Sequence, residues 1–229
     1  MTQELHYNQI PIDFGFFNVK TFDNFIIGNN KKLYNSLQNL IGSDELILIY
    51  GNKSSGKTHI CEALCNEYLE SVTFINNKPK LSGLAPRDFY ELLVIDDFDQ
   101  LISSKQDEES LFALINNQIL NKKPAVISSS KDVKDCGIHL KDLSSRLLSD
   151  KIFTISDLSD SDKLDMMILY CSQRGLEIPE KVLKYIMNNC SRDLYFLCAL
   201  IKNLDIVSLS MRRKITIPFI KKVLMLHND

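Results

Sequence analysis

The stretch Gly51-Asn52-Lys53-Ser54-Ser55-Gly56-Lys57-Thr58 decides the fold of this chain. It fits the pattern G-x-x-x-x-G-K-[ST] of the phosphate-binding P-loop. The apolar run Leu46–Tyr50 leads into it and a helical pattern follows from Thr58, which is the order of strand, loop and helix that phosphate binding uses. Lys57 would reach the β- and γ-phosphates, and the Thr58 hydroxyl would hold Mg²⁺. The alternative is a polar, glycine-containing turn that binds no ligand.

Two carboxylates follow another apolar run. Asp96 and Asp97 come directly after Leu92–Ile95, as in a Walker-B motif at the end of a buried parallel strand. Asp96 would bind the Mg²⁺ shell through water, and Asp97 would orient or deprotonate the attacking water. An acidic turn is the alternative, since Asp99 follows, but the P-loop upstream favours the nucleotide site.

Apolar runs of strand length alternate with helical patterns between residues 46 and 155. This alternation predicts the α/β fold class, with a five-stranded parallel P-loop sheet covered by helices on both faces. The expected strands are Leu46–Tyr50, Val72–Ile75, Leu92–Ile95, Ala125–Ser128 and Ile152–Ile155, and the expected helices of this part are 30–41, 58–69 and 108–120.

From residue 159 onward the sequence predicts only helices. Ser159 or Asp160 would cap the first helix, and Gly175 would end it. The third helix would begin with Arg192 in its first turn, where a cation opposes the helix dipole unless an anion lies nearby. We therefore expect three parts, namely an N-terminal arm (1–20), a nucleotide-binding α/β domain (21–157) and a small helical lid domain (158–229).

The composition excludes several classes of protein. The 229 residues are 45% hydrophobic and carry a net charge of −2, so bulk electrostatics favour neither DNA nor an acidic membrane. We expect no transmembrane run and no signal peptide. The six cysteines lack C-x-x-C spacing and form no metal-ligand pattern with the four histidines, so they are interpreted as reduced thiols. The only metal expected is the Mg²⁺ of a nucleotide.

The N-terminal arm contains a candidate peptide motif. A glutamine is followed by apolar side chains at alternate positions, a pattern typical of an extended peptide that docks into a partner's pockets. Its residues are Gln9, Ile10, Ile12 and Phe14. An ordinary edge strand or a disordered tail fits the same pattern and is favoured by the residues alone.

Other residues are candidates by their place relative to the P-loop. Ser130 follows the expected fourth strand, where a polar group would face the γ-phosphate, or would merely end a strand. Arg146 could neutralise charge on a transferring phosphoryl group, although most single arginines lie solvated at the surface. Arg192 either meets an anionic ligand or pairs with a neighbouring carboxylate. The apolar segment expected to cover the base of the nucleotide, or simply to pack in the core, is Phe25, Ile26 and Ile27.

Together these motifs resemble those of the AAA+ superfamily and, within it, the DnaA family. The segment 22–30, FDNFIIGNN, is similar to the one that precedes the P-loop of the replication initiator DnaA. The stretches 158–164, 174–179 and 213–219 look like the lid of the Hda family of DnaA-related regulators, which inactivate the initiator. The resemblance covers about residues 9–226.

The resemblance implies a regulator of replication initiation that acts on a partner. Gln9–Phe14 is similar to the peptide with which Hda-like proteins bind the sliding clamp of DNA polymerase III. The P-loop would hold ADP or ATP with Mg²⁺, and Arg146 would be an arginine finger that stimulates ATP hydrolysis by DnaA in trans. Arg192 would be the sensor 2 arginine. Ser130 stands at the sensor 1 position, where relatives often carry aspartate, which leaves the chain's own weak ATPase activity open.

The resemblance also bears on partners and location. The chain ends after the lid and its connection 76–91 is short, so neither the DNA-binding domain of DnaA nor its helix pair for single strands is expected. We expect a cytoplasmic protein without sequence-specific DNA binding, and the AAA+ interface would also allow a homodimer. A stand-alone AAA+ ATPase or helicase loader acting on DNA or helicase is the alternative, and a binding-only adaptor is a third.

Overall fold

The computed structural model describes residues 19–69, 71–76 and 91–225, which form two compact units that meet in sequence between Leu158 and Ser159. Each unit has a hydrophobic core of its own. The expected clamp-binding peptide, Gln9–Phe14, lies outside the described residues, as does most of the connection 76–91.

The first unit is built on a five-stranded sheet in which every pairing is parallel, in the order β2-β3-β4-β1-β5. This confirms the predicted α/β class. The three central strands are buried and contain no proline, as expected for a sheet that is covered on both faces, whereas the edge strand β5 is largely exposed. Their bounds are β1 (Leu46–Tyr50), β2 (Val72–Ile75), β3 (Leu92–Ile95), β4 (Ala125–Ser129) and β5 (Lys151–Thr154).

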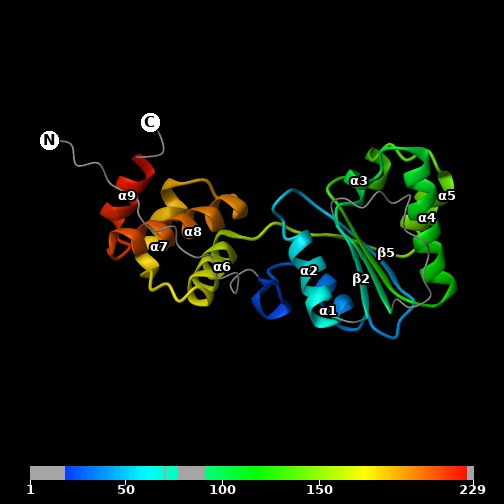
Figure 1. The fold of residues 1–229 in the computed structure, drawn as a ribbon, viewed down its shortest axis with the longest axis horizontal. Helices are drawn as coiled ribbons and strands as arrows, with labels where there is room; N and C mark the ends of the chain where they lie inside the picture. The colour runs from blue at the N-terminus through cyan, green and yellow to red at the C-terminus, as the bar shows by residue number, and fades with distance from the viewer. Residues whose placement is uncertain (1–18, 70, 77–90, 226–229) are drawn as a thin grey trace. The chain divides into compact units, whose positions relative to one another are not determined.

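Helices cover both faces of this sheet (Figure 1). Ile47 and Ile49 point to one face and pack with α1 and α2, whereas Leu46 and Leu48 point to the other and pack with α4 and α5. This division follows from the two-residue period of a strand. The elements of this unit other than the strands are η1 (Phe22–Asn24), α1 (Lys31–Gln38), α2 (Lys57–Glu67), α3 (Phe98–Leu101), α4 (Lys105–Leu120), η3 (Val133–Asp135) and α5 (Lys141–Leu147).

Helix α4 begins three residues earlier than predicted. Ser104 is its N-cap, and the Ser104 hydroxyl accepts a hydrogen bond of 3.2 Å from the Asp107 backbone N–H. The apolar periodicity on which the prediction rested starts only in the second turn, because the first turn carries acidic residues that suit the positive end of the helix dipole.

The second unit is the predicted helical lid. Ser159 and Asp162 form a capping box at the start of α6, and Gly175, with φ of 66°, follows its end. The apolar faces of its helices enclose one core that includes Met167, Ile186 and Leu204. The helices are α6 (Asp160–Gln173), α7 (Glu180–Asn189), α8 (Leu194–Met211) and α9 (Ile217–Met225).

The predicted start of α8 at Arg192 was wrong. The Asp193 carboxylate accepts a hydrogen bond of 2.9 Å from the Phe196 backbone N–H, so Asp193 is the N-cap and the helix begins at Leu194. Aspartate is as good an N-cap as serine, so Ser191 and Asp193 are both candidates from local sequence alone. Arg192 therefore precedes the helix, and the argument from an unfavourable dipole does not apply to it.

Helix α8 also corrects the expectation that no segment could span a membrane. By length and composition alone its 18 residues, with a mean hydropathy of 1.5, would suffice. However, α8 includes Asp205, whose carboxylate lies 2.9 Å from the Arg174 guanidinium within the lid, and Leu197 and Ile201 are fully buried in the lid core. These contacts pack one face of α8 against the core of the lid.

Candidate nucleotide-binding site

The sheet brings the predicted phosphate-binding and acidic residues together. The P-loop follows β1, Asp96 and Asp97 follow β3, and Ser130 follows β4. Strands β3, β4 and β1 are neighbours in the sheet, and all are parallel, so their carboxyl ends meet at one edge. In an open α/β sheet this edge is the usual place for a ligand.

The P-loop backbone adopts conformations that few side chains tolerate. Gly56 has φ of 105° and immediately precedes α2, whose N-terminus therefore opens into the loop. A Cβ atom on Gly51 would overlap Cγ2 of Ile155 and lie 3.1 Å from the Ile155 carbonyl oxygen. The two glycines are thus required here, one by its dihedral angle and the other by the close passage of the chain after β5.

Lys57 is buried at the centre of the loop, with only 5% of its surface exposed. Its Nζ donates hydrogen bonds of 2.9 Å to the carbonyl oxygens of Gly51 and Asn52, and lies 4.0 Å from Oδ1 of Asp97. The ammonium is therefore held where an anion in the loop would meet it. The nearby Ser55 hydroxyl is buried and has no hydrogen-bond partner among the described residues. An orphaned buried donor beside a buried cation fits a phosphate ligand.

Ser128 organises the acidic pair, a role that we did not predict. Its buried hydroxyl donates a hydrogen bond of 2.6 Å to Oδ1 of Asp96 and accepts one of 2.7 Å from the Asp97 backbone N–H. Asp97 is held in the left-handed region, with φ of 47°. A signal was available, since Ile127 pairs with Ile95 in the parallel register, which sets Ser128 beside Asp96.

Ser130 closes the polar network at the same edge. Its hydroxyl donates a hydrogen bond of 3.2 Å to Oδ1 of Asp97, and its backbone N–H donates one of 3.0 Å to Oδ1 of Asp99. The predicted strand-end residue thus contacts the second carboxylate directly. Asp99, whose only predicted role is in an acidic turn, thus fixes the loop that carries Ser130.

The pKa of Asp97 is raised above its ordinary value. Burial is the largest cause, and the neighbouring Asp96 carboxylate adds to it, while Lys57 and the Ser130 hydroxyl act in the opposite direction. The folded protein therefore binds this proton more tightly than the unfolded chain does. Between the ordinary and the raised pKa the stability of the fold falls as the pH rises, and the ionised Asp97 is a cost to the free protein at neutral pH.

Replacing Asp97 with asparagine is expected to stabilise the ligand-free protein at neutral pH. The amide removes the charge that burial and Asp96 oppose, and its oxygen can still accept the Ser130 hydrogen bond. We expect Tm at pH 7 to rise by about 2–4 °C, which corresponds to a stabilisation of ~1 kcal/mol in a chain of this size. We also expect Tm to decrease less steeply with rising pH than in the wild type. Asp135→Asn, at an exposed aspartate of η3, is the control, and an unchanged or lower Tm for Asp97→Asn would contradict this interpretation.

The segment predicted to cover the base lies against the P-loop. Phe25, Ile26 and Ile27 are all half-buried, and a Cβ atom on Gly56 would lie 3.3 Å from the Phe25 ring. Phe25 also contacts the His59 ring, with 5.4 Å between ring centroids. The structure thus brings Phe25 to the side of the loop, with Ile26 and Ile27 next to it in sequence.

Asn30 fixes this segment, and sequence reasoning missed it. Asn30 is 5% exposed; its amide donates a hydrogen bond of 3.1 Å to the Ser156 carbonyl oxygen, and its Oδ1 accepts one of 2.7 Å from the Ser156 backbone N–H. Residues 126 positions apart are thereby joined beside the P-loop. The asparagine-rich tract in which Asn30 lies gave no sign of this contact.

The residues present fit a Mg²⁺–nucleotide. Thr58 lies in the first turn of α2, and Asp96 is 6% exposed and hydrogen-bonded by Ser128, so its carboxylate is oriented at the same edge. Among the residues that the structure describes, no group of three or more His, Cys, Asp or Glu side chains could hold a metal by itself. Mg²⁺ usually takes only one or two carboxylates from the protein and its other ligands from phosphate and water.

Arg146 does not belong to this site. It lies in α5, which packs on α4 on the face of the sheet opposite to α2 (Figure 1). It occupies the last turn of α5, shortly before β5 begins, and thus lies toward the amino edge of the sheet, whereas the P-loop lies at the carboxyl edge. Its Nη2 donates a hydrogen bond of 3.2 Å to Oδ1 of Asn116 in α4. The structure therefore separates Arg146 from its own P-loop.

Arg192 belongs to the lid. Its Nη1 pairs with Asp160 at the start of α6, and its Nε donates a hydrogen bond of 3.2 Å to the Met187 carbonyl oxygen. Of the alternatives that the sequence offered, pairing with a carboxylate is the arrangement in the structure, with Asp160 as the partner. Both side chains of the pair are more than half exposed.

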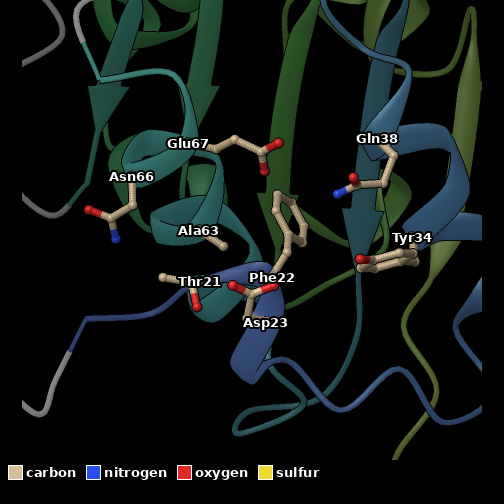
Figure 2. A pocket seen from close by; sticks show the side chains of 8 residues that line it. All are labelled: Thr21, Phe22, Asp23, Tyr34, Gln38, Ala63, Asn66 and Glu67. Atoms are coloured by element: carbon tan, nitrogen blue, oxygen red, sulfur yellow. The ribbon is translucent and has the colours of Figure 1, made fainter.

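A hollow of about 310 Å³ lies elsewhere, between η1, α1 and α2 (Figure 2). The Phe22 ring stands inside it and meets the edge of the Tyr34 ring, with 5.7 Å between centroids. Glu67 and Asp23 also line it. No P-loop residue does, and two carboxylates do not suit a phosphate, so this hollow is separate from the nucleotide site.

Two family models match the chain. One, described as "Hda, lid domain", matches residues 160–224, and the other, described as "Novel STAND NTPase 3", matches residues 29–173, more than half of the chain. An uncharacterized protein of Haemophilus influenzae is 30% identical over 235 residues, a match that covers 95% of this chain and 99% of the relative. The two proteins therefore belong to one family.

Solved structures show the same fold. Domain III of the replication initiation protein DnaA from Thermotoga maritima has a TM-score of 0.82 at 20% identity, covering 92% of this chain and 97% of that domain. AMPPCP-bound DnaA from Aquifex aeolicus has a TM-score of 0.68 at 21% identity, covering 84% of this chain and 66% of that one. The chain therefore belongs to the family described by the NTPase model and is, by its lid and its fold, an Hda-like, DnaA-related AAA+ protein.

Proposed function

We propose that this protein regulates replication initiation by binding adenine nucleotide and the sliding clamp and by stimulating ATP hydrolysis by DnaA in trans. The observation that carries the proposal is the position of Arg146 on the opposite face and toward the opposite edge of the sheet from its own P-loop. An arginine placed there cannot serve its own nucleotide and is available to a neighbouring molecule. The lid and the DnaA-like fold supply DnaA as the candidate neighbour.

The chain's own site binds ADP or ATP in this account. Lys57 exchanges the carbonyl oxygens of Gly51 and Asn52 for phosphate oxygens, and the N–H groups at the start of α2 complete the cradle. Bound Mg²⁺ would supply charge neutralisation between the phosphates, with Thr58 and Asp96 holding it. Asp97 is oriented by Ser130, and with serine at this position we expect the chain's own hydrolysis to be weak.

Arg146 then acts on the nucleotide of the partner. Its guanidinium would exchange the neutral Asn116 oxygen for the charge that develops on the transferring phosphoryl group. Hydrogen bonds between ionised groups are stronger than those to a neutral oxygen, so the exchange favours the partner site. DnaA would hydrolyse its ATP and become inactive. The same surface would also allow a homodimer.

Arg192 is proposed as the sensor 2 arginine. Its pair with Asp160 is exposed, and exposed ion pairs contribute about 0–1 kcal/mol, so little opposes its transfer to a phosphate. A lid that gains or loses this contact would report which nucleotide is bound. The proposal includes a cytoplasmic location and neither sequence-specific DNA binding nor membrane attachment.

Single substitutions in the N-terminal arm test the proposed clamp binding. The residues of the proposed motif are Gln9, Ile10, Ile12 and Phe14. On purified, immobilised clamp we expect Gln9→Ala and Phe14→Ala each to weaken retention by about 30-fold, as for anchors worth ~2 kcal/mol. Gln3→Ala, in the same arm, is the control and should bind like the wild type. Equal retention of all four proteins would exclude this peptide as the clamp-binding motif.

A stand-alone ATPase or helicase loader is the second candidate function. The oriented Asp96 and Asp97 lie beside the P-loop lysine, with Lys57 only 4.0 Å from Asp97, and this arrangement favours the candidate. It requires ATP turnover by the isolated chain, stimulated by DNA and abolished by Asp97→Asn. ADP binding without any stimulation of DnaA would instead indicate a binding-only adaptor.

A further inference from the structure

Helix α5, which carries Arg146, has no capping side chain at its N-cap position. Its N-cap residue is Leu140, which offers no hydrogen-bonding side chain. The carboxylate of Glu108, from α4, instead satisfies backbone donors at the start of the helix. It accepts hydrogen bonds of 2.6 Å from the Leu140 backbone N–H and 3.1 Å from the His139 backbone N–H. A residue 32 positions upstream thus supplies the cap.

The Glu108 carboxylate is committed to this role. Glu108 is 5% exposed, and the His139 ring lies within 3.3 Å of its Oε1. Burial by itself raises the pKa of Glu108, but the N–H donors of His139 and Leu140 outweigh it and hold the pKa below its ordinary value. The ionised form is therefore the one that the start of α5 stabilises, in agreement with the positive end of a helix dipole.

The other end of α5 is also attached to α4. There the contact is the hydrogen bond of 3.2 Å from Arg146 to Asn116. Glu108 and Asn116 are eight residues apart in α4, about 12 Å along its axis, so α4 holds α5 near both ends. Because α5 has only seven residues, these attachments near its two ends act together with the buried Leu143 and Leu147 to fix the direction of the helix.

We infer that Glu108 is a positioning residue for Arg146, because its cap sets the orientation of α5 and with it the place of the guanidinium. The inference rests on the proposed function of Arg146. Stimulation in trans requires the arginine to reach a phosphate of another molecule in one geometry, and a misplacement of about 1 Å can cost 10²-fold in rate. Glu108 acts through α5 and contacts no substrate.

The test compares Glu108→Gln with Glu109→Gln. The substitution is the same and the residues are adjacent, but Glu109 is exposed and forms only a surface pair with Lys105 at 3.6 Å. In single-turnover assays of DnaA-bound ATP on loaded clamp, we expect Glu108→Gln to lower the rate at saturating protein by about 10- to 100-fold. Glu109→Gln should match the wild type. The ADP affinity of both variants, and the concentration that gives half of each maximal rate, should stay within about twofold of the wild type.

The outcomes separate the two proposals. If part of a variant were unfolded, more of it would be needed to reach half of the maximal hydrolysis rate, but the maximal rate itself would be unchanged. A lowered maximal rate therefore identifies a positioning effect. Equal maxima for both glutamine variants, with Arg146→Ala inactive, would overturn the inference alone, and a fully active Arg146→Ala would overturn the proposed function. If Glu108→Gln does not fold, Glu108→Asp keeps the charge but withdraws it by one methylene. Its maximum should then fall between those of the wild type and Arg146→Ala, and a wild-type maximum would overturn the inference.

Discussion

Replacing Arg146 with alanine is expected to lower the stimulated rate of ATP hydrolysis by DnaA by about 10³- to 10⁵-fold, the range for arginines that act on a phosphoryl group in trans. The physical reason is that a planar guanidinium in a site without water neutralises charge that exists only in the transition state. The measurement is release of phosphate from DnaA preloaded with ATP, at saturating regulator and loaded clamp.

Two controls make the Arg146 result specific. Lys141→Ala changes an exposed cation at the start of the same helix and should leave stimulation intact. Arg146→Lys keeps the charge but loses the two-pronged geometry, so we expect it to remain far below the wild type. ADP affinity should be unaffected in all three, since α5 lies on the face of the sheet opposite to α2. Unchanged stimulation by Arg146→Ala would exclude the finger role.

Replacing Lys57 with alanine is expected to weaken ADP binding by about 10²- to 10⁴-fold. The ammonium would make two charge-assisted hydrogen bonds to phosphate oxygens, worth ~1.5–3 kcal/mol each, and it is already desolvated at the base of the loop. Isothermal titration of ADP with Mg²⁺ measures the loss. Lys53→Ala, in the same loop but exposed, is the matched control and should bind ADP within a few-fold of the wild type. Equal affinities of the Lys57 variant and the wild type would remove the P-loop from the account.

The sequence was sufficient for features that local patterns determine. Leu46–Tyr50 and Leu92–Ile95 are apolar runs of the length and kind that a parallel sheet covered on both faces buries, and each is followed at once by its functional residues. Because the carboxyl ends of neighbouring parallel strands meet at one edge, the proximity of Lys57 and Asp97 was implied as soon as the fold class was correct. The lid helices were predictable for the same reason, from caps such as Ser159 and stops such as Gly175.

Residues whose partners are distant in sequence were missed, although the strand register offered a signal for Ser128 once the sheet order was known. Ser128 contacts Asp96 from 32 residues away, Asn30 contacts Ser156 from 126 away, and Glu108 caps α5 from another helix. Each is a common polar residue whose type carries no local signal, and only the packing of elements gives it a role. The error at Arg192 had the opposite cause, since Ser191 and Asp193 are both good N-caps and local preference could not choose between them.

The central claim is that the catalytic arginine of this protein serves the nucleotide of another molecule. The most direct test is a single-turnover experiment in which labelled ATP is bound to DnaA alone, and this protein, loaded with unlabelled ADP, is added with clamp. The account predicts that the label is hydrolysed several orders of magnitude faster than by DnaA alone, and that the isolated protein turns over ATP slowly at most. No acceleration on DnaA, together with turnover by the isolated protein that Asp97→Asn abolishes, would contradict it.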